Sequence, residues 1–373
     1  MQIALVVLAV ATLLIGIFSF WRRPASQSRA APTDRRSRPR PMPFPMPAVA
    51  PVPAASSAAA VSLIVPGPAD VMDQLYAVAF DGASVAKANE PPNPEHAAML
   101  SHAIKILDGI TTQPRYTPRR PTQLPHLMQT LREDDASIRA ISHIVAQDPA
   151  LAGNLLRVAN SPIYRVSQKP VESIERAITL LGTEGLRSMV TAALLQPVLT
   201  GESGVFGKFS EIIWEHSLFS ASIAETHAGM IEKTDSFAAQ LLGLMHGLGS
   251  IIVFRVARDQ YAARKQLAPD AAVIAGLLEA HAAPTAQRIA ASWQLSERIT
   301  DALTDQTRHT NQELLSPLGR SLRFGRFVGA LVMLCKLGKL QESLARAALL
   351  QGEKDHAPVV KIWERMVKGH RLE

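Results

Sequence analysis

The stretch that decides the fold is an apolar run with one histidine in it, Leu241-Leu242-Gly243-Leu244-Met245-His246-Gly247-Leu248-Gly249. A lone histidine on an apolar helix is usually a packed core residue. The alternative is a metal ligand, because a histidine followed by a carboxylate can hold a cation and leave a position open for water. Here Gly247 follows, and glycine has no side chain with which to bind a metal.

Composition around this run predicts an all-α protein. Hydrophobic residues make up 47% of the 373 residues, while aromatic residues make up only 5%. A chain rich in alanine and leucine suits helices packed on helices better than a β-sandwich. The single cysteine, Cys335, excludes an internal disulfide and fits a reducing compartment. It lies in an apolar segment and is expected to serve packing.

The net charge of +7 is concentrated in one short strip of the sequence. Residues 22–40 contain seven arginines and one aspartate, which account for six of the seven net charges. A nucleic-acid-binding domain needs its basic residues on the folded part. The sequence therefore predicts no nucleic-acid partner.

The N-terminal segment, residues 1–21, is predicted to be a transmembrane anchor. From Ile3 to Phe20 it is apolar apart from two small hydroxyl residues, long enough for a hydrocarbon core of roughly 30 Å. Trp21, Arg22 and Arg23 follow, and positive charge marks the cytoplasmic side. This predicts a single-pass inner-membrane protein with a cytoplasmic C-terminal domain. A cleaved signal peptide is the weaker alternative, since the charges follow the apolar stretch.

Residues 22–68 are expected to form a basic linker rich in proline and alanine. Proline alternates with other residues from Pro39 to Pro47, a pattern that favours extended polyproline II and excludes a helix. Such a segment can also bind aromatic grooves, but a spacer is the simpler interpretation. Short helices are then predicted at residues 69–87 and 95–109.

A polar motif marks the start and the end of the next predicted helix. Asp148 is a good N-cap after Gln147, and Pro149 suits the first helical position. Asn160 and Ser161 follow the apolar stripe and end the helix. These polar residues either satisfy backbone groups at the helix ends or form part of a partner surface.

Several motifs in the expected order resemble the HDOD domain, a non-catalytic relative of the HD and HD-GYP phosphohydrolases. They are Leu124-Pro125, Gln147-Asp148-Pro149-Ala150-Leu151, Leu155-Leu156-Arg157-Val158-Ala159-Asn160-Ser161, Ala177-Ile178-Thr179-Leu180-Leu181-Gly182, Trp214-Glu215-His216-Ser217, the run around His246, His281 and Trp293-Gln294-Leu295. The resemblance covers about residues 120–310 and implies an HD-like helical bundle.

The resemblance also shows what the chain lacks as an enzyme. In the hydrolases a histidine, a His-Asp pair and a later aspartate hold the metal. His216 and His246 match the two histidines, Gly247 replaces the aspartate, and Asp301 or Asp305 could supply a late carboxylate. Two histidines without a placed carboxylate fall short of the usual three ligands of a catalytic zinc. The sequence therefore predicts no catalytic residues, no bound metal and no cofactor.

Smaller features of the sequence allow structural interpretations. Gly325, Gly329 and Gly338 either permit close helix contacts or are simply tolerated. His281 could cap a helix or face a pocket, but it is expected to pack near the start of a helix. The helices after residue 315 should complete the bundle or make a dimer contact.

The resemblance implies a regulatory role in bacterial signal transduction. With the predicted anchor, we expect a membrane-anchored, non-catalytic module that binds protein partners. Two alternatives remain open: a divergent metal-dependent phosphohydrolase, and a nucleotide-sensing module that uses the vestigial cleft. The predicted organisation is an anchor (1–21), a linker (22–68), a short helical segment (69–114), the HDOD-like domain (115–315) and C-terminal helices (316–373). The oligomeric state does not follow from the sequence.

Overall fold

The apolar run around His246 forms the middle of a long central helix, α9 (Ser236–Ala262). Asp235 precedes this helix, and its carboxylate accepts a hydrogen bond from the backbone N–H of Ala238 at 3.0 Å. Such a cap satisfies an amide that the first helical turn leaves unpaired. Side chains are buried on nearly every face of α9, as expected for a helix enclosed by other helices.

The computed structural model describes residues 65–85, 93–118, 149–164, 206–307, 312–351 and 356–368, with short pieces between 120 and 195. These residues belong to one compact unit, 62–373. Its helices are α2 (Pro68–Ala79), α3 (Pro94–Asp108), η1 (Ile110–Thr112), α6 (Pro149–Ala159), α8 (Phe209–His227), η2 (Ala228–Glu232), α9, α10 (Ala271–Ser292), α11 (Glu297–Thr304), η3 (Asp305–Thr307), η4 (Gln312–Leu314), α12 (Pro317–Lys336), α13 (Glu342–Leu350) and α14 (His356–Lys368). All regular structure in the described residues is helical, which confirms the predicted all-α class.

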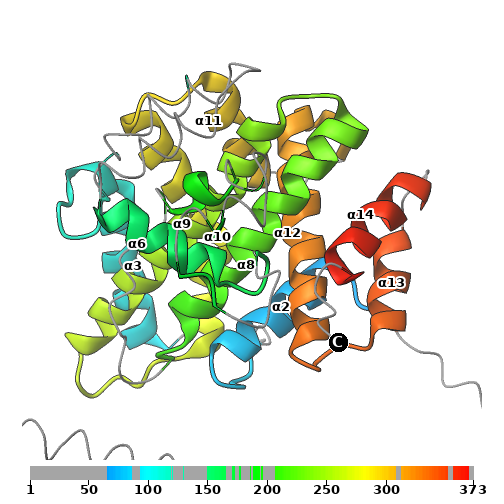
Figure 1. Ribbon diagram of the computed structural model, residues 1–373. Coiled ribbons are helices and arrows are strands. Elements are labelled where there is room, and N and C mark those ends of the chain that lie inside the picture. The colour runs from blue at the N-terminus through cyan, green and yellow to red at the C-terminus, as the bar shows by residue number, and fades with distance from the viewer. Residues whose placement is uncertain are drawn as a thin grey trace, which may run out of the picture. The chain divides into compact units, whose positions relative to one another are not determined.

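Four helices form the centre of the bundle. α9 packs against α8 and α10, and α12 packs along α8. In Figure 1 these helices run through the middle of the domain, with α3 and α6 on one side and α13 and α14 on the other. The C-terminal helices therefore complete the bundle, one of the two alternatives that the sequence left open.

Glycines allow unusually close contacts where these helices cross. A Cβ atom added at Gly243 of α9 would lie 2.6 Å from the Cα of Ala221 in α8. One added at Gly325 of α12 would lie 2.4 Å from the carbonyl oxygen of Ser220. The predicted close helix contact is confirmed for Gly325. Gly338 instead has a φ of +65° just after the end of α12.

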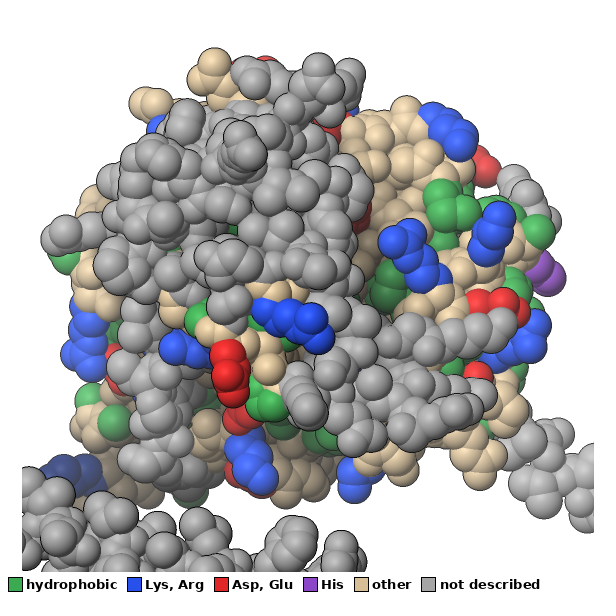
Figure 2. Space-filling view, in the orientation of Figure 1, with side chains coloured by type: hydrophobic (Ala, Val, Ile, Leu, Met, Phe, Trp, Pro, Cys, Tyr) green, Lys and Arg blue, Asp and Glu red, His purple; other side chains and the backbone are tan. Residues whose placement is uncertain are grey.

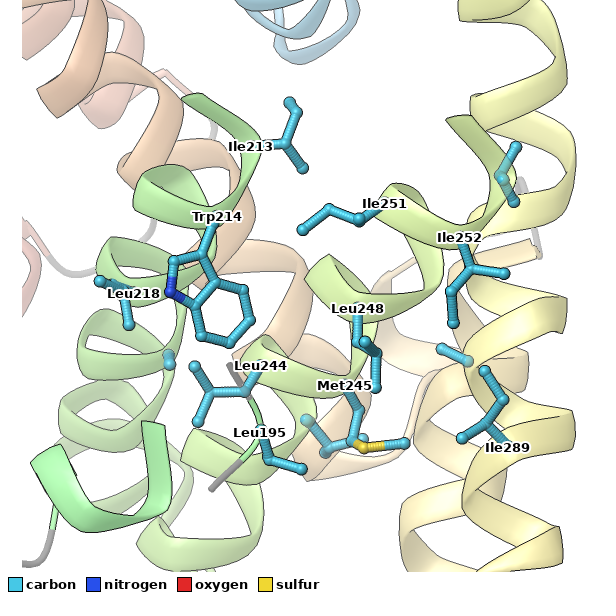
Figure 3. Close-up of a cluster of buried hydrophobic side chains, with 14 of the residues drawn as sticks. Leu195, Ile213, Trp214, Leu218, Leu244, Met245, Leu248, Ile251, Ile252 and Ile289 are labelled. Atoms are coloured by element: carbon cyan, nitrogen blue, oxygen red, sulfur yellow. The ribbon is translucent and has the colours of Figure 1, made fainter. Parts of the chain in front are cut away.

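An apolar core fills the space between the central helices. Figure 3 shows the indole ring of Trp214 in α8 close to Leu244 of α9, while Met245 and Leu248 of α9 lie towards Ile289 of α10. Burying an aliphatic or aromatic side chain of this size contributes roughly 1.5–3 kcal/mol. The core therefore fixes the relative positions of the helices that carry the two predicted site histidines.

The C-terminal helices build a second apolar cluster on the outer side of α12. α13 and α14 contact α12 and each other, and Trp363 is among their buried residues. Cys335 packs against this cluster, and burial with the nearby Glu342 raises the pKa of its thiol to about 11. The predicted packing role of Cys335 is therefore confirmed.

The N-terminal helices agree with the sequence except at one boundary. α3 matches the prediction of residues 95–109, but α2 ends at Ala79 rather than at residue 87. Asp81 and Gly82 have φ values of +55° and +86°, and the N–H of Gly82 donates to the carbonyl oxygen of Ala77. This left-handed turn ends the helix early, so the prediction was wrong from Phe80 to Val85.

One described helix, α9, is long and apolar enough to cross a membrane. Its most apolar window is 94% buried within the domain, which is the behaviour of a core helix. The predicted anchor, residues 1–21, and the linker up to residue 64 lie outside the described residues. On the face seen in Figure 2, basic and acidic side chains are interspersed over the described surface.

Candidate functional site

The two predicted site histidines lie in the interior of the bundle, on neighbouring helices. His216 of α8 and His246 of α9 are both buried, with 5% and 6% of their surface exposed. They are close enough for His216 to contribute to a lowered pKa of His246. The structure therefore brings together the pair that the sequence predicted.

His216 is held by the backbone of α12. Its Nε2 atom lies 2.9 Å from the carbonyl oxygen of Arg326 and 3.2 Å from the hydroxyl of Ser220. A carbonyl oxygen can only accept, so Nε2 carries the proton in this hydrogen bond. Burial lowers the pKa of His216 to about 4, which keeps the ring neutral. A protonated Nε2 has no lone pair to offer a metal ion.

His246 is also held in the neutral form. Burial, the charge of Arg326 and the neighbouring His216 together lower its pKa well below the usual value. A second positive charge is therefore unfavourable at this place in the bundle. Charge repulsion of this kind is strong in an interior where water does not screen it.

Ser217 occupies the space beside Gly247 that an aspartate would need. A Cβ atom added to Gly247 would lie 1.7 Å from the hydroxyl oxygen of Ser217 and 2.4 Å from its Cβ. Ser217 is fixed there, since its hydroxyl donates to the carbonyl oxygen of Ile213 at 2.6 Å. Glycine at position 247 therefore allows the close packing between α8 and α9 at Ser217.

Arg326 is a central site residue that the sequence reasoning missed. Its guanidinium lies near both imidazoles, since it lowers the pKa of His216 and of His246. Burial lowers its own pKa, and it donates a hydrogen bond to the hydroxyl of Tyr76 in α2. The available signal was an arginine within an aromatic and apolar run, between Phe324 and Phe327.

The late carboxylates considered from the sequence have other roles. The Asp305 carboxylate accepts hydrogen bonds from the backbone N–H and the hydroxyl of Ser316, at 2.9 and 2.6 Å, just before α12 begins. Asp301 is exposed on α11. Within the part of the chain that the structure describes, no group of three or more His, Cys, Asp or Glu side chains could hold a metal.

The polar motif after α6 makes a structural contact. The side-chain amide of Asn160 donates to the carbonyl oxygens of Leu156 and Val171, and its oxygen accepts from the N–H of Val171 at 2.7 Å. This joins the end of α6 to a segment eleven residues further on. The Ser161 hydroxyl is buried without a hydrogen-bond partner among the described residues.

Other predicted positions are only partly described. α6 begins at Pro149, as predicted, whereas Gln147, Asp148, Trp21, Arg22 and Arg23 lie outside the described residues. His281 lies in the middle of α10 rather than near a helix start, so that prediction was wrong. The apolar periodicity of α10 extends ten residues before His281, and Asp270 caps its start.

The buried histidines should destabilise the protein in mild acid. His216 and His227 have a pKa of about 4 in the folded chain, mainly because of burial, against 6.5 ordinarily. Between these values the unfolded chain binds more protons, so stability falls as pH drops from 6.5 towards 4. Each histidine should contribute about 3 kcal/mol to this loss. Urea unfolding at pH 7.5 and pH 5.0 measures it.

The variant His227→Gln distinguishes the loss of stability caused by histidine protonation from the loss caused by carboxylate protonation. His227 accepts or donates one hydrogen bond with Ser321 and stacks on Phe324. His227→Gln removes its titration, so the loss between pH 7.5 and pH 5.0 should shrink by about 2 kcal/mol. An unchanged pH dependence in this variant would contradict the assignment.

Comparison with known proteins finds similarities at low sequence identity. A Shewanella amazonensis SB2B protein named "Putative phosphohydrolase" is 21% identical over 72% of this chain and 95% of that chain, with a TM-score of 0.46. A Geobacter sulfurreducens HDOD domain protein of unknown function is 20% identical, over 73% of this chain and 90% of its own, with a TM-score of 0.45. An uncharacterized protein of Treponema pallidum (strain Nichols) is 20% identical over 159 residues, which span 43% of this chain and 30% of that protein.

The sequence profile of one family, the HDOD domain, matches this chain. Its sequence profile matches residues 117–309, more than half of the chain. This range contains α8, α9 and α10, and with them His216, His246 and Gly247. The helical bundle described above is the HD-like fold that the resemblance implied. The chain belongs to the HDOD domain family.

Proposed function

We propose that this chain is a regulatory, non-catalytic module of bacterial signal transduction that acts by binding other proteins. The observation that carries the proposal is the state of the vestigial metal site. The charge of Arg326 lowers the pKa of both histidines, and Ser217 fills the space next to Gly247. A positive charge of the protein thus acts on both imidazoles, and a serine side chain lies where an aspartate at position 247 would have to lie.

Physical chemistry favours this interpretation over a divergent hydrolase. Metal catalysis needs a cation held by several ligands with an open position for water. The positive charge of Arg326, which lowers the pKa of His216 and of His246, would repel that cation, and Nε2 of His216 is engaged with the carbonyl oxygen of Arg326. The same groups stabilise the closed packing of α8, α9 and α12. The site therefore supports a structural core better than a reaction centre.

Turnover by the purified full-length chain tests the proposal. Phosphatase and phosphodiesterase activity would be measured with p-nitrophenyl phosphate and bis(p-nitrophenyl) phosphate, with Mn²⁺ or Mg²⁺ added. We expect no rate above that of the metal-containing buffer, because no metal-bound water can form. A rate that is abolished in His246→Ala, while the variant remains folded, would contradict the non-catalytic assignment.

Membrane anchoring is the second part of the proposal. The apolar stretch of residues 1–21 and the basic flank of Trp21, Arg22 and Arg23 support a single inner-membrane span with a cytoplasmic domain. The proline-rich linker then leads to α2, and it would keep the domain near membrane-bound partners at high effective concentration. Reporter fusions after residue 373 test the topology. A reporter active only outside the cytoplasm would reject this orientation.

A further inference from the structure

A cavity of about 600 Å³ lies between α2, α10 and α12. Its volume falls within the range of small-molecule binding sites. Arg326 lines it, as do Tyr76 of α2 and Arg323 of α12. The cavity thus adjoins the arginine whose charge lowers the pKa of the two histidines.

Arg326 lines the cavity and keeps part of its surface accessible. Its guanidinium carries five N–H groups, and the hydroxyl of Tyr76 accepts a hydrogen bond from it, so further N–H groups are available to an anion. The Nε atom of Arg326 and the Oε1 atom of Gln306 have no hydrogen-bond partner among the described residues, but both are closed off from solvent and do not face the cavity.

The two arginines fit an anionic group. Arg323 and Arg326 are three residues apart on α12, a spacing that places them on one helix face. A guanidinium makes strong paired hydrogen bonds to phosphate oxygens, and a phosphate has enough terminal oxygens for two guanidinium groups. Arg323 already donates to the carbonyl oxygen of Asp305 at 3.1 Å, which holds its side chain in place.

The other residues that line the cavity fit a ligand with hydroxyl or amino groups as well as an anionic group. Glu279 and Asp73 also line the cavity, and Glu279 is exposed at its mouth. Their carboxylates would repel a phosphate but accept hydrogen bonds from hydroxyl or amino groups. Pro284 has no N–H, so it cannot donate to the carbonyl oxygen of Ala280, another lining residue. Tyr76, Met72 and Phe327 provide aromatic and apolar surface.

We infer that this cavity binds a phosphate monoester that carries hydroxyl or amino groups, with its phosphate on Arg323 and Arg326. Its hydrogen-bond donors then lie towards Glu279 and Asp73. This deepens the proposed function and rests on it, because a non-catalytic cleft can hold such an ester without cleaving it. One wall of the cavity is α2, the first described helix after the predicted linker.

Calorimetric titration of the full-length chain in detergent micelles tests the inference. Adenosine monophosphate and glucose 6-phosphate are the two esters, and adenosine, glucose and inorganic phosphate are the matched probes. We expect at least one ester to bind at least tenfold more tightly than its phosphate-free counterpart. The ester that binds better shows whether the natural ligand resembles a nucleotide or a sugar phosphate. Failure of both esters to bind would overturn the inference and leave the proposed function intact.

Variants locate the binding. Arg323→Gln should weaken ester binding about tenfold or more, whereas Arg346→Gln, which removes an exposed arginine of α13 outside the cavity, should change it less than twofold. Ala69→Glu adds a negative charge at an exposed lining position without removing a contact, and it should weaken binding as well. If both lining variants bind like the unaltered chain, the ester binds elsewhere and the inference fails.

Phosphate release separates the two proposals. Incubation of the bound ester with the full-length chain should leave it intact. If the ester binds through Arg323 and is hydrolysed, the cavity assignment stands and the non-catalytic function is wrong.

Discussion

Gly247→Asp should destabilise the protein by about 3 to 5 kcal/mol and should not produce a hydrolase. The new Cβ atom would overlap the hydroxyl of Ser217, 1.7 Å away, and Ser217 cannot move without breaking its bond to Ile213. The carboxylate would also be buried between α8 and α9, where an unpaired charge is unfavourable. Chemical denaturation gives the loss of stability, and the phosphatase assay gives the activity.

A control substitution at Gly153 and a compensating substitution at Ser217 show whether the loss of stability comes from the contact between Gly247 and Ser217. Gly153→Asp places the same side chain on an exposed helical position with no atom within 4 Å, so stability should change by less than about 1 kcal/mol. Gly247→Ala alone should lose about 1 to 3 kcal/mol, and adding Ser217→Gly should recover part of that loss. Gly247→Asp that is as stable as the unaltered protein would contradict the packing described for this site.

Gly243→Ala should be the second strongly destabilising substitution, at about 2 to 3 kcal/mol. The added Cβ atom would lie 2.6 Å from the Cα and 2.7 Å from the backbone N of Ala221. Backbone atoms cannot rotate away as a side chain can, so α8 and α9 must separate along their shared core. The midpoint and slope of urea unfolding measure the effect.

The same substitution at an open position should have the opposite sign. Gly153 lies in α6 with open space around its Cα, so Gly153→Ala should raise stability by about 0.5 to 1 kcal/mol, because alanine favours helix. Both substitutions replace a helical glycine by alanine, so the gain in helix propensity is the same and the difference in stability reflects the helix contact at Gly243. Equal effects at Gly153 and Gly243 would show that close helix contact does not govern stability at Gly243.

The helices and the pair of histidines could be predicted from the sequence because their signals are local. Apolar periodicity and the prolines that begin α6 and α12 fix helix positions within a few residues. The early end of α2 was missed although Asp81-Gly82 is a local turn signal, because glycine readily adopts the left-handed conformation that ends a helix.

The other residues of the site could not be predicted, because they come together only through contacts between segments far apart in the sequence. Ser217 follows His216 and reads as an ordinary helix residue, yet its contact with Gly247 exists only once α8 and α9 pack. Arg326 lies 110 residues after His216, and only the packing of α12 along α8 brings it to the imidazoles. The cavity needs α2, α10 and α12 together. Such features require the fold before they can be recognised.

The buried site combines three features of the described residues. Gly247 leaves room for Ser217 of α8, and the charge of Arg326 lowers the pKa of both histidines. His216 donates a hydrogen bond to the backbone of α12, and the cavity lined by Arg326 is open to a ligand.

Measurement of bound metal shows directly whether His216 and His246 still form a metal site. The full-length chain would be purified after expression with added Mn²⁺ and Fe²⁺, and bound metals would be quantified by mass spectrometry beside His246→Ala. We expect far less than one metal ion per chain, and the same content in the unaltered chain and in His246→Ala. One tightly bound ion per chain that is lost in His246→Ala would contradict it.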